Sequence, residues 1–294
     1  MIFLLMKLNG NNLKIAIQKK GNLTAGSLDI LKKAGLQFEV LENRLLSSCE
    51  NFPLEIIFVR DDDIPEYVKD GIADLGILGI DVLAESQLKF KKLLDLGFSR
   101  CKLQIAVPRD SQMTSLSQLN NKRIATSFPN ILRKFLKKKK IKAKIIKVAG
   151  SVEIAPIVGS ADAICDLVSS GSTLKTHDLV PTKTVLVSQA TLVSKLIIDP
   201  DKQTKVSDLL RRIKAVLQAQ KTKYIMLNAP KNKVNAIAKI IPGTKSPSVI
   251  PLNKPGWVAM HSVVEEDRFW ETLDKLRAVG ARSILVLPIE KMII

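Results

Sequence analysis

The residues best suited to hold a ligand lie between Val148 and Leu174, where the chain reads V-A-G-S-V-E-I-A-P-I-V-G-S-A-D-A-I-C-D-L-V-S-S-G-S-T-L. The second half of this stretch starts with the apolar run Ala163–Cys165, continues with Asp166, and ends in the small and hydroxyl-bearing residues 169–173. Small residues let successive backbone N–H groups converge on an anion, and a helix that starts there adds the positive end of its dipole. The pattern predicts a phosphate-binding loop, preceded by an acid suited to accept hydrogen bonds from ribose hydroxyls.

A second turn of the same design lies upstream, where residues 150–153 read Gly-Ser-Val-Glu and end in the carboxylate of Glu153. Two turns with one carboxylate each favour a sugar phosphate over a bare nucleotide as the ligand. The alternative for residues 169–173 is an ordinary strand-to-helix turn, because serine and glycine are common turn residues.

The composition bounds the architecture and the class of ligand. With 294 residues, the chain has room for two or three domains of roughly 100–200 residues each. Hydrophobic residues make up 46% of the chain and aromatic residues 4%, so the predicted core is aliphatic. A formal net charge of +18 favours anionic ligands through its field. No stretch approaches the roughly 18 uninterrupted apolar residues of a membrane span, so no membrane partner is expected.

Lysines are concentrated between Lys134 and Lys147. This concentration has two possible explanations. A nucleic-acid-binding patch is one, but only Phe135 lies nearby to stack on bases. The other is a solvated helix end that leads into a strand. We expect the second, and therefore no nucleic-acid partner.

The three cysteines, Cys49, Cys101 and Cys165, are odd in number and far apart, which fits neither a disulfide framework nor a zinc site. A reducing cytoplasm is expected. The apolar run Met1–Met6 has no basic residue before it and is too short for the core of a signal peptide. Whether Met1 or Met6 is the true start stays open.

The first part of the chain alternates strands and helices, which predicts a largely parallel, doubly wound sheet. Strands are expected at residues 13–18, 54–60 and 73–79, and a helix at 28–34. The acids Asp61–Asp63 precede a helix, where acids usually serve as partners of the helix dipole.

A second lobe is expected from Cys101 onward. Its predicted strands are residues 103–107, 123–126 and 145–148, with a helix at 130–139. Strands 185–188 and 190–193 then return toward the first lobe, so two crossovers join the lobes and place a ligand cleft between them.

The last part of the chain has a self-contained pattern after a connecting helix at residues 208–221. The expected order is strand 224–228, helix 231–241, strand 248–252, strand 257–264, helix 268–279 and strand 283–287. This βαββαβ order is that of the ferredoxin-like split motif.

Several blocks of the sequence resemble ATP phosphoribosyltransferase, the first enzyme of histidine biosynthesis. They occur in the order of that family and include the loop region, which resembles its 5-phosphoribosyl-1-pyrophosphate (PRPP) loop. The matching blocks are residues 15–21, 60–65, 73–77, 122–126, 150–174 and 284–291. The residues after about 221 resemble the long form, which has a regulatory domain.

The resemblance implies an α/β fold with a two-lobed, periplasmic-binding-protein-like catalytic region and a C-terminal ferredoxin-like βαββαβ domain. Lobe I is expected at residues 1–101 and 189–220, lobe II with the PRPP loop at 102–188, and the regulatory domain at 221–294. A bilobal solute-binding protein is the alternative, but it predicts a secretion signal and leaves the C-terminal motif without a role.

The resemblance also implies a reaction, in which adenine N1 of ATP displaces pyrophosphate from C1 of PRPP with magnesium carried on PRPP. This reaction requires no covalent nucleophile. The chain has only two histidines, His177 and His261, that could serve as a base for one. Residues implied to bind PRPP are Glu153, Asp166, Ser169, Ser170, Gly171, Ser172 and Thr173, with Mg²⁺ near the two acids. Residues implied to bind ATP or pyrophosphate are Lys20, Arg60 and, as a weaker candidate, Arg44. Glu153, Asp166, Lys20 and Arg60 are the residues expected to take part in catalysis. For Arg60 the alternative is a surface ion pair with the neighbouring aspartates.

Regulation is implied in the same way, by histidine acting as a feedback inhibitor of a homo-hexamer built from dimers. Positions that match the effector pocket are Asn228, Ser246, Ser248 and Ala281. The sequence departs from the family at Asn22, where arginine is common, at Ile80-Asp81, where Glu-Asn is common, and at Ser248, where threonine is common. Neither the strength of inhibition nor binding of AMP or ADP can be read from the sequence.

Overall fold

The computed structural model describes residues 11–41, 44–111, 113, 115–243 and 246–293, so the question of Met1 against Met6 lies outside the described residues. The chain divides into two compact units. The first contains Leu36–Val206 and the described residues up to Asp29, and the second contains Ile30–Gly35 and the residues from Ser207 onward.

The first unit begins with a six-stranded sheet of order β2-β3-β1-β4-β11-β5, which forms lobe I. The strand β1 pairs in parallel with β3 and β4, whereas β11 pairs antiparallel with β4 and β5. The strands are β1 Leu13–Gln18, β2 Leu46–Ser48, β3 Leu54–Val59, β4 Leu75–Gly79, β5 Lys91–Asp95 and β11 Ala190–Ser194. All five residues of β4 are buried, as expected for a central strand that is covered on both faces.

Four helices accompany these strands, namely α1 Asn22–Lys33, α2 Ile64–Lys69, α3 Ile80–Ser86 and α6 Pro200–Gln220. The acids Asp61–Asp63 form a 3-10 turn ahead of α2, and Pro65 lies in its first turn. Proline is tolerated there because the N–H it lacks would have no partner within the helix.

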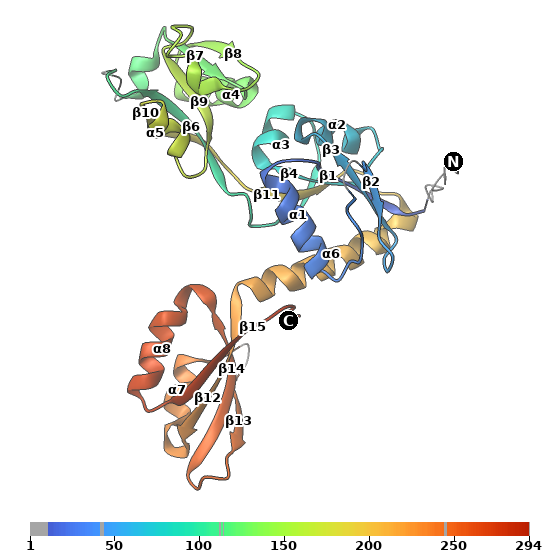
Figure 1. The fold of residues 1–294 in the computed structure, drawn as a ribbon, viewed down its shortest axis with the longest axis vertical. Coiled ribbons are helices and arrows are strands. Elements are labelled where there is room, and N and C mark those ends of the chain that lie inside the picture. Colours follow the sequence, from blue (N-terminus) through green and yellow to red (C-terminus); the bar gives the residue numbers. More distant parts are fainter. Residues whose placement is uncertain (1–10, 42–43, 112, 114, 244–245, 294) are drawn as a thin grey trace. The chain divides into compact units, whose positions relative to one another are not determined.

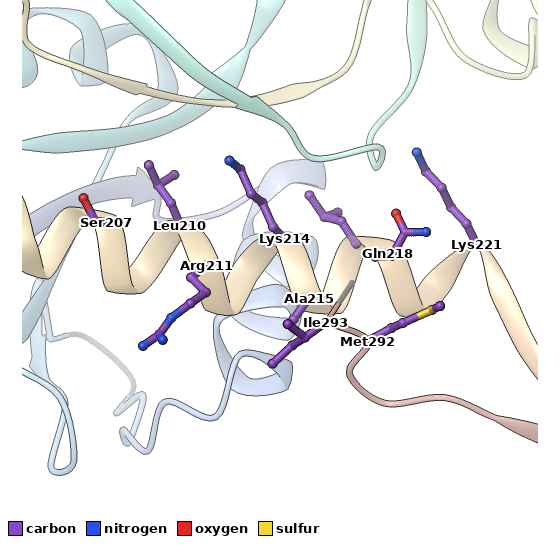
Figure 2. A pocket seen from close by; sticks show the side chains of 10 residues that line it. Ser207, Leu210, Arg211, Lys214, Ala215, Gln218, Lys221, Met292 and Ile293 are labelled. Atoms are coloured by element: carbon purple, nitrogen blue, oxygen red, sulfur yellow. The ribbon is translucent and has the colours of Figure 1, made fainter. Parts of the chain in front are cut away.

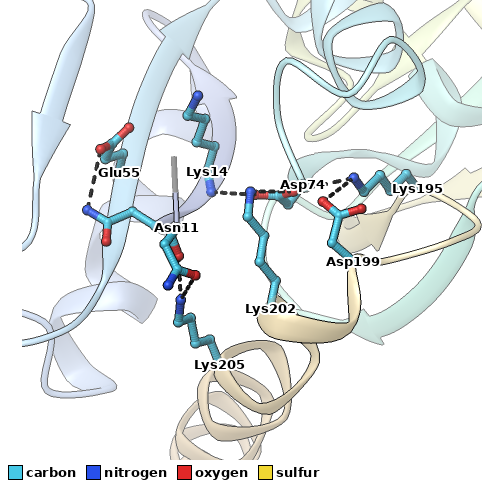
Figure 3. Close-up of polar contacts among 9 residues, drawn as sticks. Asn11, Lys14, Glu55, Asp74, Lys195, Asp199, Lys202 and Lys205 are labelled. Atoms are coloured by element: carbon cyan, nitrogen blue, oxygen red, sulfur yellow. Dashed lines mark hydrogen bonds and ion pairs between the residues drawn. The ribbon is translucent and has the colours of Figure 1, made fainter. Parts of the chain in front are cut away.

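A buried ion pair joins lobe I to the start of α6 (Figure 3). The Asp74 carboxylate is 2% exposed and accepts hydrogen bonds from Lys202 Nζ at 2.9 and 3.1 Å. It also accepts the backbone N–H of Lys14 at 2.9 Å, and Lys195 Nζ lies 3.7 Å away. A carboxylate this deeply buried needs such partners because desolvation of an unpaired charge is costly.

Lobe II is a five-stranded sheet of order β10-β6-β9-β7-β8. The strands are β6 Cys101–Pro108, β7 Arg123–Thr126, β8 Lys144–Lys147, β9 Ala163–Val168 and β10 Leu179–Ser188, and the helices are α4 Pro129–Lys139 and α5 Ser172–Thr176. The lysine-rich segment is the exposed end of α4 followed by β8, which confirms the expected helix end leading into a strand. The start of β6 and the end of β10 pair with each other, so the two crossovers to lobe I lie side by side.

The second unit contains a four-stranded antiparallel sheet of order β13-β14-β12-β15, with α7 and α8 on one side of it (Figure 1). Its elements are β12 Thr222–Pro230, α7 Val234–Ile240, β13 Ser248–Pro251, β14 Trp257–Glu265, α8 Phe269–Ala278 and β15 Arg282–Pro288. This order confirms the predicted βαββαβ motif. Together with the two α/β lobes it confirms the predicted fold class.

Several elements differ from the expectations. The connecting helix α6 begins at Pro200, well before the predicted start at residue 208. The strands β2 and β5 and the helix α3 were not expected. The strand β5 carries Lys91, Lys92 and Asp95 with no buried residue, which hides the alternating pattern of a strand. Among the described residues, no helix combines the length and the apolar character that crossing a bilayer requires.

Candidate active site

A cavity of about 810 Å³ is lined by residues of both lobes and of the crossovers. Lobe II contributes Glu153 and the continuous run Asp166–Leu174. Lobe I and the crossovers contribute Gln18, Gly21, Asn22, Leu23, Asp61, Gly79, Asp81, Val82, Ser99 and Cys101. The cavity therefore brings together both predicted acids and all five residues of the predicted phosphate loop.

The loop begins where β9 ends and closes into the short helix α5. Gly171 has a φ of 80°, a left-handed conformation that glycine adopts without steric cost, and it precedes the first residue of α5. The Oγ atoms of Ser170 and Ser172 lie 3.0 Å apart, which fixes the bend. Ser169 and Ser170 are exposed, so their hydroxyls are available to a ligand.

Asp166 lies on β9 opposite Gln104 of β6, in the half of the strand that leads into the loop. Burial raises the pKa of Asp166 above its ordinary value, and the charge of Glu153 raises the pKa further, while the backbone N–H of Leu167 lowers it. The two carboxylates are therefore close enough to interact electrostatically. Glu153 itself is held in a 3-10 turn, Val152–Ile154, after Ser151 at a φ of 47°.

The lobe I wall of the cavity is fixed by Gln18 at the end of β1. Its Oε1 accepts the backbone N–H of Leu23 at 3.0 Å, and its carbonyl accepts the hydroxyl of Thr24 at 3.0 Å. Gly21 has a φ of 138°, and a Cβ there would lie 2.6 Å from the Gln18 amide. The turn between β1 and α1 therefore requires glycine, and sequence reasoning missed the part played by Gln18.

Asp81, Ser188 and Cys101 form a cluster at the crossovers, and none of them was a predicted site residue. The Ser188 hydroxyl donates to the carboxylate of Asp81, and the backbone N–H of Asp81 donates to the same hydroxyl at 3.1 Å. Asp81 is 6% exposed and Ser188 is 1% exposed. Burial raises the pKa of the Cys101 thiol, the charge of Asp81 raises it further, and the hydroxyl of Ser188 lowers it.

The cations predicted to bind the nucleotide are not among the residues that line this cavity. Lys20, Arg44 and Arg60 are exposed. Gln18, Gly21 and Asp61 line the cavity. Lys20 lies between the first two in sequence, and Arg60 immediately precedes Asp61. Two of the three cations, Lys20 and Arg60, are therefore sequence neighbours of residues that line the cavity. The roles of all three cations stay predictions.

The residues predicted to bind histidine occupy different environments in the second unit. Asn228 and Ser248 lie on β12 and β13, where alternation places them on the sheet face away from α7 and α8. Ser246 is exposed, whereas Ala281 is 1% exposed and belongs to the core between the sheet and its helices. On the same face as Asn228, the Tyr224 hydroxyl lies 2.7 Å from His261 Nδ1.

Another hollow, of about 620 Å³, lies along α6 beside Met292 and Ile293 (Figure 2). Among the described residues, its lining includes the cations Arg211, Lys214 and Lys221 and no carboxylate. It lacks the paired acids and the small-residue loop, so it does not fit the predicted sugar-phosphate chemistry.

Comparison with known proteins identifies the family. The family model described as ATP phosphoribosyltransferase matches residues 60–215, and the model described as HisG, C-terminal domain, matches residues 219–291. The chain belongs to the ATP phosphoribosyltransferase family. The resemblance drawn from the sequence blocks is therefore confirmed, and the chain is a transferase of this family with its C-terminal domain.

Individual members of the ATP phosphoribosyltransferase family match along nearly the whole chain. The protein of that name from Cytophaga hutchinsonii is 49% identical over 281 residues, which are 96% of this chain and 98% of that protein. The one from Bacteroides fragilis is 45% identical over 282 residues, which are 96% of this chain and 100% of that protein. Among solved structures, the ATP phosphoribosyl transferase (HisG:HisZ) complex from Thermotoga maritima matches with a TM-score of 0.61 at 31% identity, covering 70% of this chain and 98% of that chain.

Proposed function

We propose that the protein joins adenine N1 of ATP to C1 of the ribose of PRPP, giving phosphoribosyl-ATP and pyrophosphate as the first step of histidine biosynthesis. The observation that supports this most is that one cavity holds both Asp166 and Glu153 together with the loop Ser169–Thr173. A site for ribose and phosphate needs carboxylates for hydroxyl groups and backbone N–H groups for the anion, and this cavity is lined by both kinds of group.

The residues would act by binding and by electrostatics. The N–H and hydroxyl groups of Ser169–Thr173 hold the 5-phosphate, and the carboxylate of Asp166 accepts hydrogen bonds from the ribose hydroxyls. As the bond from C1 to pyrophosphate lengthens, positive charge develops on the ribose, and Glu153 stabilises it. Lys20, Arg60 and Arg44 are proposed to contact the phosphates of ATP and the departing pyrophosphate. Positioning and charge stabilisation then account for most of the rate enhancement, without a covalent intermediate.

Magnesium is proposed to arrive with PRPP, and the residues present fit it. Mg²⁺ is usually bound through one or two carboxylates plus phosphates of the substrate, and Glu153 and Asp166 supply two interacting carboxylates in one cavity. The described residues contain no group of three or more acid, histidine or cysteine side chains arranged to hold a metal ion. The substrate would therefore provide the remaining ligands, and the ion would neutralise charge on pyrophosphate.

The regulatory part of the proposal concerns the C-terminal domain, at residues 221–294. Histidine is proposed to bind at Asn228, Ser246, Ser248 and Ala281 and to inhibit a cytoplasmic homo-hexamer. The sheet face away from α7 and α8 exposes apolar side chains, which often mark a contact between subunits. These are Tyr224, Ile250, Leu285 and Leu287.

The proposal is tested by mixing the pure protein with ATP, PRPP and magnesium and following the near-ultraviolet absorbance of N1-substituted adenine. Absorbance should rise only when all three are present, and mass spectrometry should find phosphoribosyl-ATP and one pyrophosphate per turnover. If no such product forms, the proposed reaction is wrong for this protein.

A further inference from the structure

The helix α3 belongs to lobe I, yet one of its faces is in contact with lobe II. Asp81 and Glu85 are four residues apart and therefore lie on the same side of the helix. Asp81 bonds the hydroxyl of Ser188 at the end of β10, and the partly buried Ala84 packs against the lobe II core cluster. This face of α3 thus joins the two lobes beside the crossovers.

Glu85 makes the most specific of these contacts, because its carboxylate caps the first turn of α4 in lobe II. One carboxylate oxygen, Oε1, accepts the backbone N–H of Asn130 at 2.9 Å. The other, Oε2, accepts the N–H of Ile131 at 3.0 Å and that of Asn130 at 3.1 Å. The Asn130 side chain in turn donates to the Glu85 carbonyl at 3.0 Å.

The sequence at the start of α4 leaves these N–H groups without a local partner. The residue at the cap position is Phe128, which offers no side-chain hydrogen bond, and Pro129 has no N–H. Leu132 already bonds the Phe128 carbonyl. The N–H groups of Asn130 and Ile131 are therefore satisfied by a residue of the other lobe. A carboxylate at this end of a helix is further stabilised by the helix dipole.

From this geometry we propose that Glu85 is a positioning residue that holds lobe II in the orientation in which the phosphate loop faces the lobe I wall of the cavity. Its effect on catalysis rests on the proposed function. The two substrates would be held mainly by different lobes, so the rate of the reaction depends on the angle between the lobes. The binding of a ligand that contacts only the phosphate loop does not depend on that angle.

The test compares Glu85→Ala and Glu85→Gln with the unaltered protein in steady-state kinetics. Misplacing reacting groups by about 1 Å can cost about 100-fold, so Glu85→Ala should lower kcat/KM by about tenfold or more. The variant Glu85→Gln keeps one acceptor oxygen, so its kcat/KM should lie between those of Glu85→Ala and the unaltered protein. Affinity for ribose 5-phosphate, measured by calorimetry, should stay unchanged in both variants. A parallel loss of ribose 5-phosphate affinity would mean damage to lobe II and would overturn the proposal.

A matched control separates the interlobe contact from the loss of a helix cap. Ser115 precedes a 3-10 turn within lobe II, where Gln118 Oε1 accepts its backbone N–H at 2.9 Å and its hydroxyl at 3.0 Å. Ser115→Ala removes the hydroxyl bond, so it should lower the melting temperature without changing kcat/KM. If Glu85→Ala behaves in the same way, Glu85 is only a cap and the proposal is wrong.

The proposal also has a test that does not depend on the reaction. Spin labels at Lys69→Cys on α2 and Lys138→Cys on α4, with the native cysteines replaced by alanine, report the distance between the lobes. The distance distribution should broaden or shift in Glu85→Ala, and an unchanged distribution overturns the proposal. If the unaltered protein fails to transfer phosphoribosyl groups, only the proposed function fails, and this measurement still decides the role of Glu85.

Discussion

At the scale of single residues, the account depends most on Asp166. Replacing Asp166 by asparagine keeps the shape but removes the charge that accepts the ribose hydroxyls. Turnover should therefore fall at least about tenfold, because removing one positioned group that acts in the transition state usually costs more than that in rate. Burial raises the pKa of Asp166 in the folded protein above its value in the unfolded chain. The contribution of Asp166 to the free energy of unfolding is therefore fully present below the unfolded pKa and is lost as pH rises through the folded pKa. At neutral pH the melting temperature of Asp166→Asn should therefore equal or slightly exceed that of the unaltered protein. Normal turnover in this variant would remove Asp166 from the site.

The same raised pKa predicts a pH dependence of the reaction. The ionised carboxylate is the form that accepts hydrogen bonds from ribose, so kcat/KM should fall on the acid side as Asp166 becomes protonated. Because burial and Glu153 raise the pKa, this fall should lie above the ordinary aspartate value of about 3.9. Glu153→Gln should move the fall to lower pH, since it removes a neighbouring negative charge. A pH profile that keeps its acid limb unchanged in Glu153→Gln contradicts this coupling.

How well the sequence predicted the site depended on how local each contact is. The loop Ser169–Thr173 and Asp166 could be picked out because they form one continuous run with a recognisable composition; they line one cavity, and their binding roles stay predictions. Asp81 was missed because its partner Ser188 is 107 residues away in the chain. Gln18 was missed because glutamine at a strand end has no distinctive pattern, although its side chain fixes the turn that follows.

At the scale of elements, the buried pair of Asp74 and Lys202 should control how firmly α6 is attached to lobe I. Removing one partner of a buried ion pair leaves an uncompensated charge, which typically costs about 3–5 kcal/mol. Lys202→Met removes the nearer cation but leaves Lys195 Nζ 3.7 Å from Asp74 and the Lys14 N–H bonded to it. It should therefore lower the free energy of unfolding by at most about 3–5 kcal/mol, measured by urea denaturation.

The control for this prediction is the double variant Asp74→Leu with Lys202→Met. It removes both charges, so its stability should be higher than that of Lys202→Met alone, since the effects of contacting residues are not additive. If the double variant loses the sum of the two single losses, the ion pair is not an energetic unit.

Most elements were predictable from the sequence because their apolar periodicity is strong, as in β1 and β7, whose bounds match the expected ones. The exceptions have physical reasons. The strand β2 has only three residues, too few for a pattern. The helix α3 directly follows β4 and continues its apolar run, so the sequence shows no break between them.

At the scale of the whole molecule, the C-terminal domain should make the activity sensitive to histidine. Millimolar histidine should inhibit formation of phosphoribosyl-ATP by the unaltered protein. In the variant Asn228→Ala the inhibition should weaken, while kcat and KM without histidine stay the same, because Asn228 lies in the second unit and the proposed catalytic residues lie in the first. Indifference of the unaltered protein to histidine would contradict the regulatory proposal.

The most direct test of the central claim is a crystal structure of the protein with PRPP and magnesium. The account predicts that the 5-phosphate lies within hydrogen-bonding distance of the backbone N–H groups of residues 170–173 and that the ribose hydroxyls contact Asp166. A loop that stays empty while PRPP binds elsewhere, or a ribose turned away from Asp166, would contradict it.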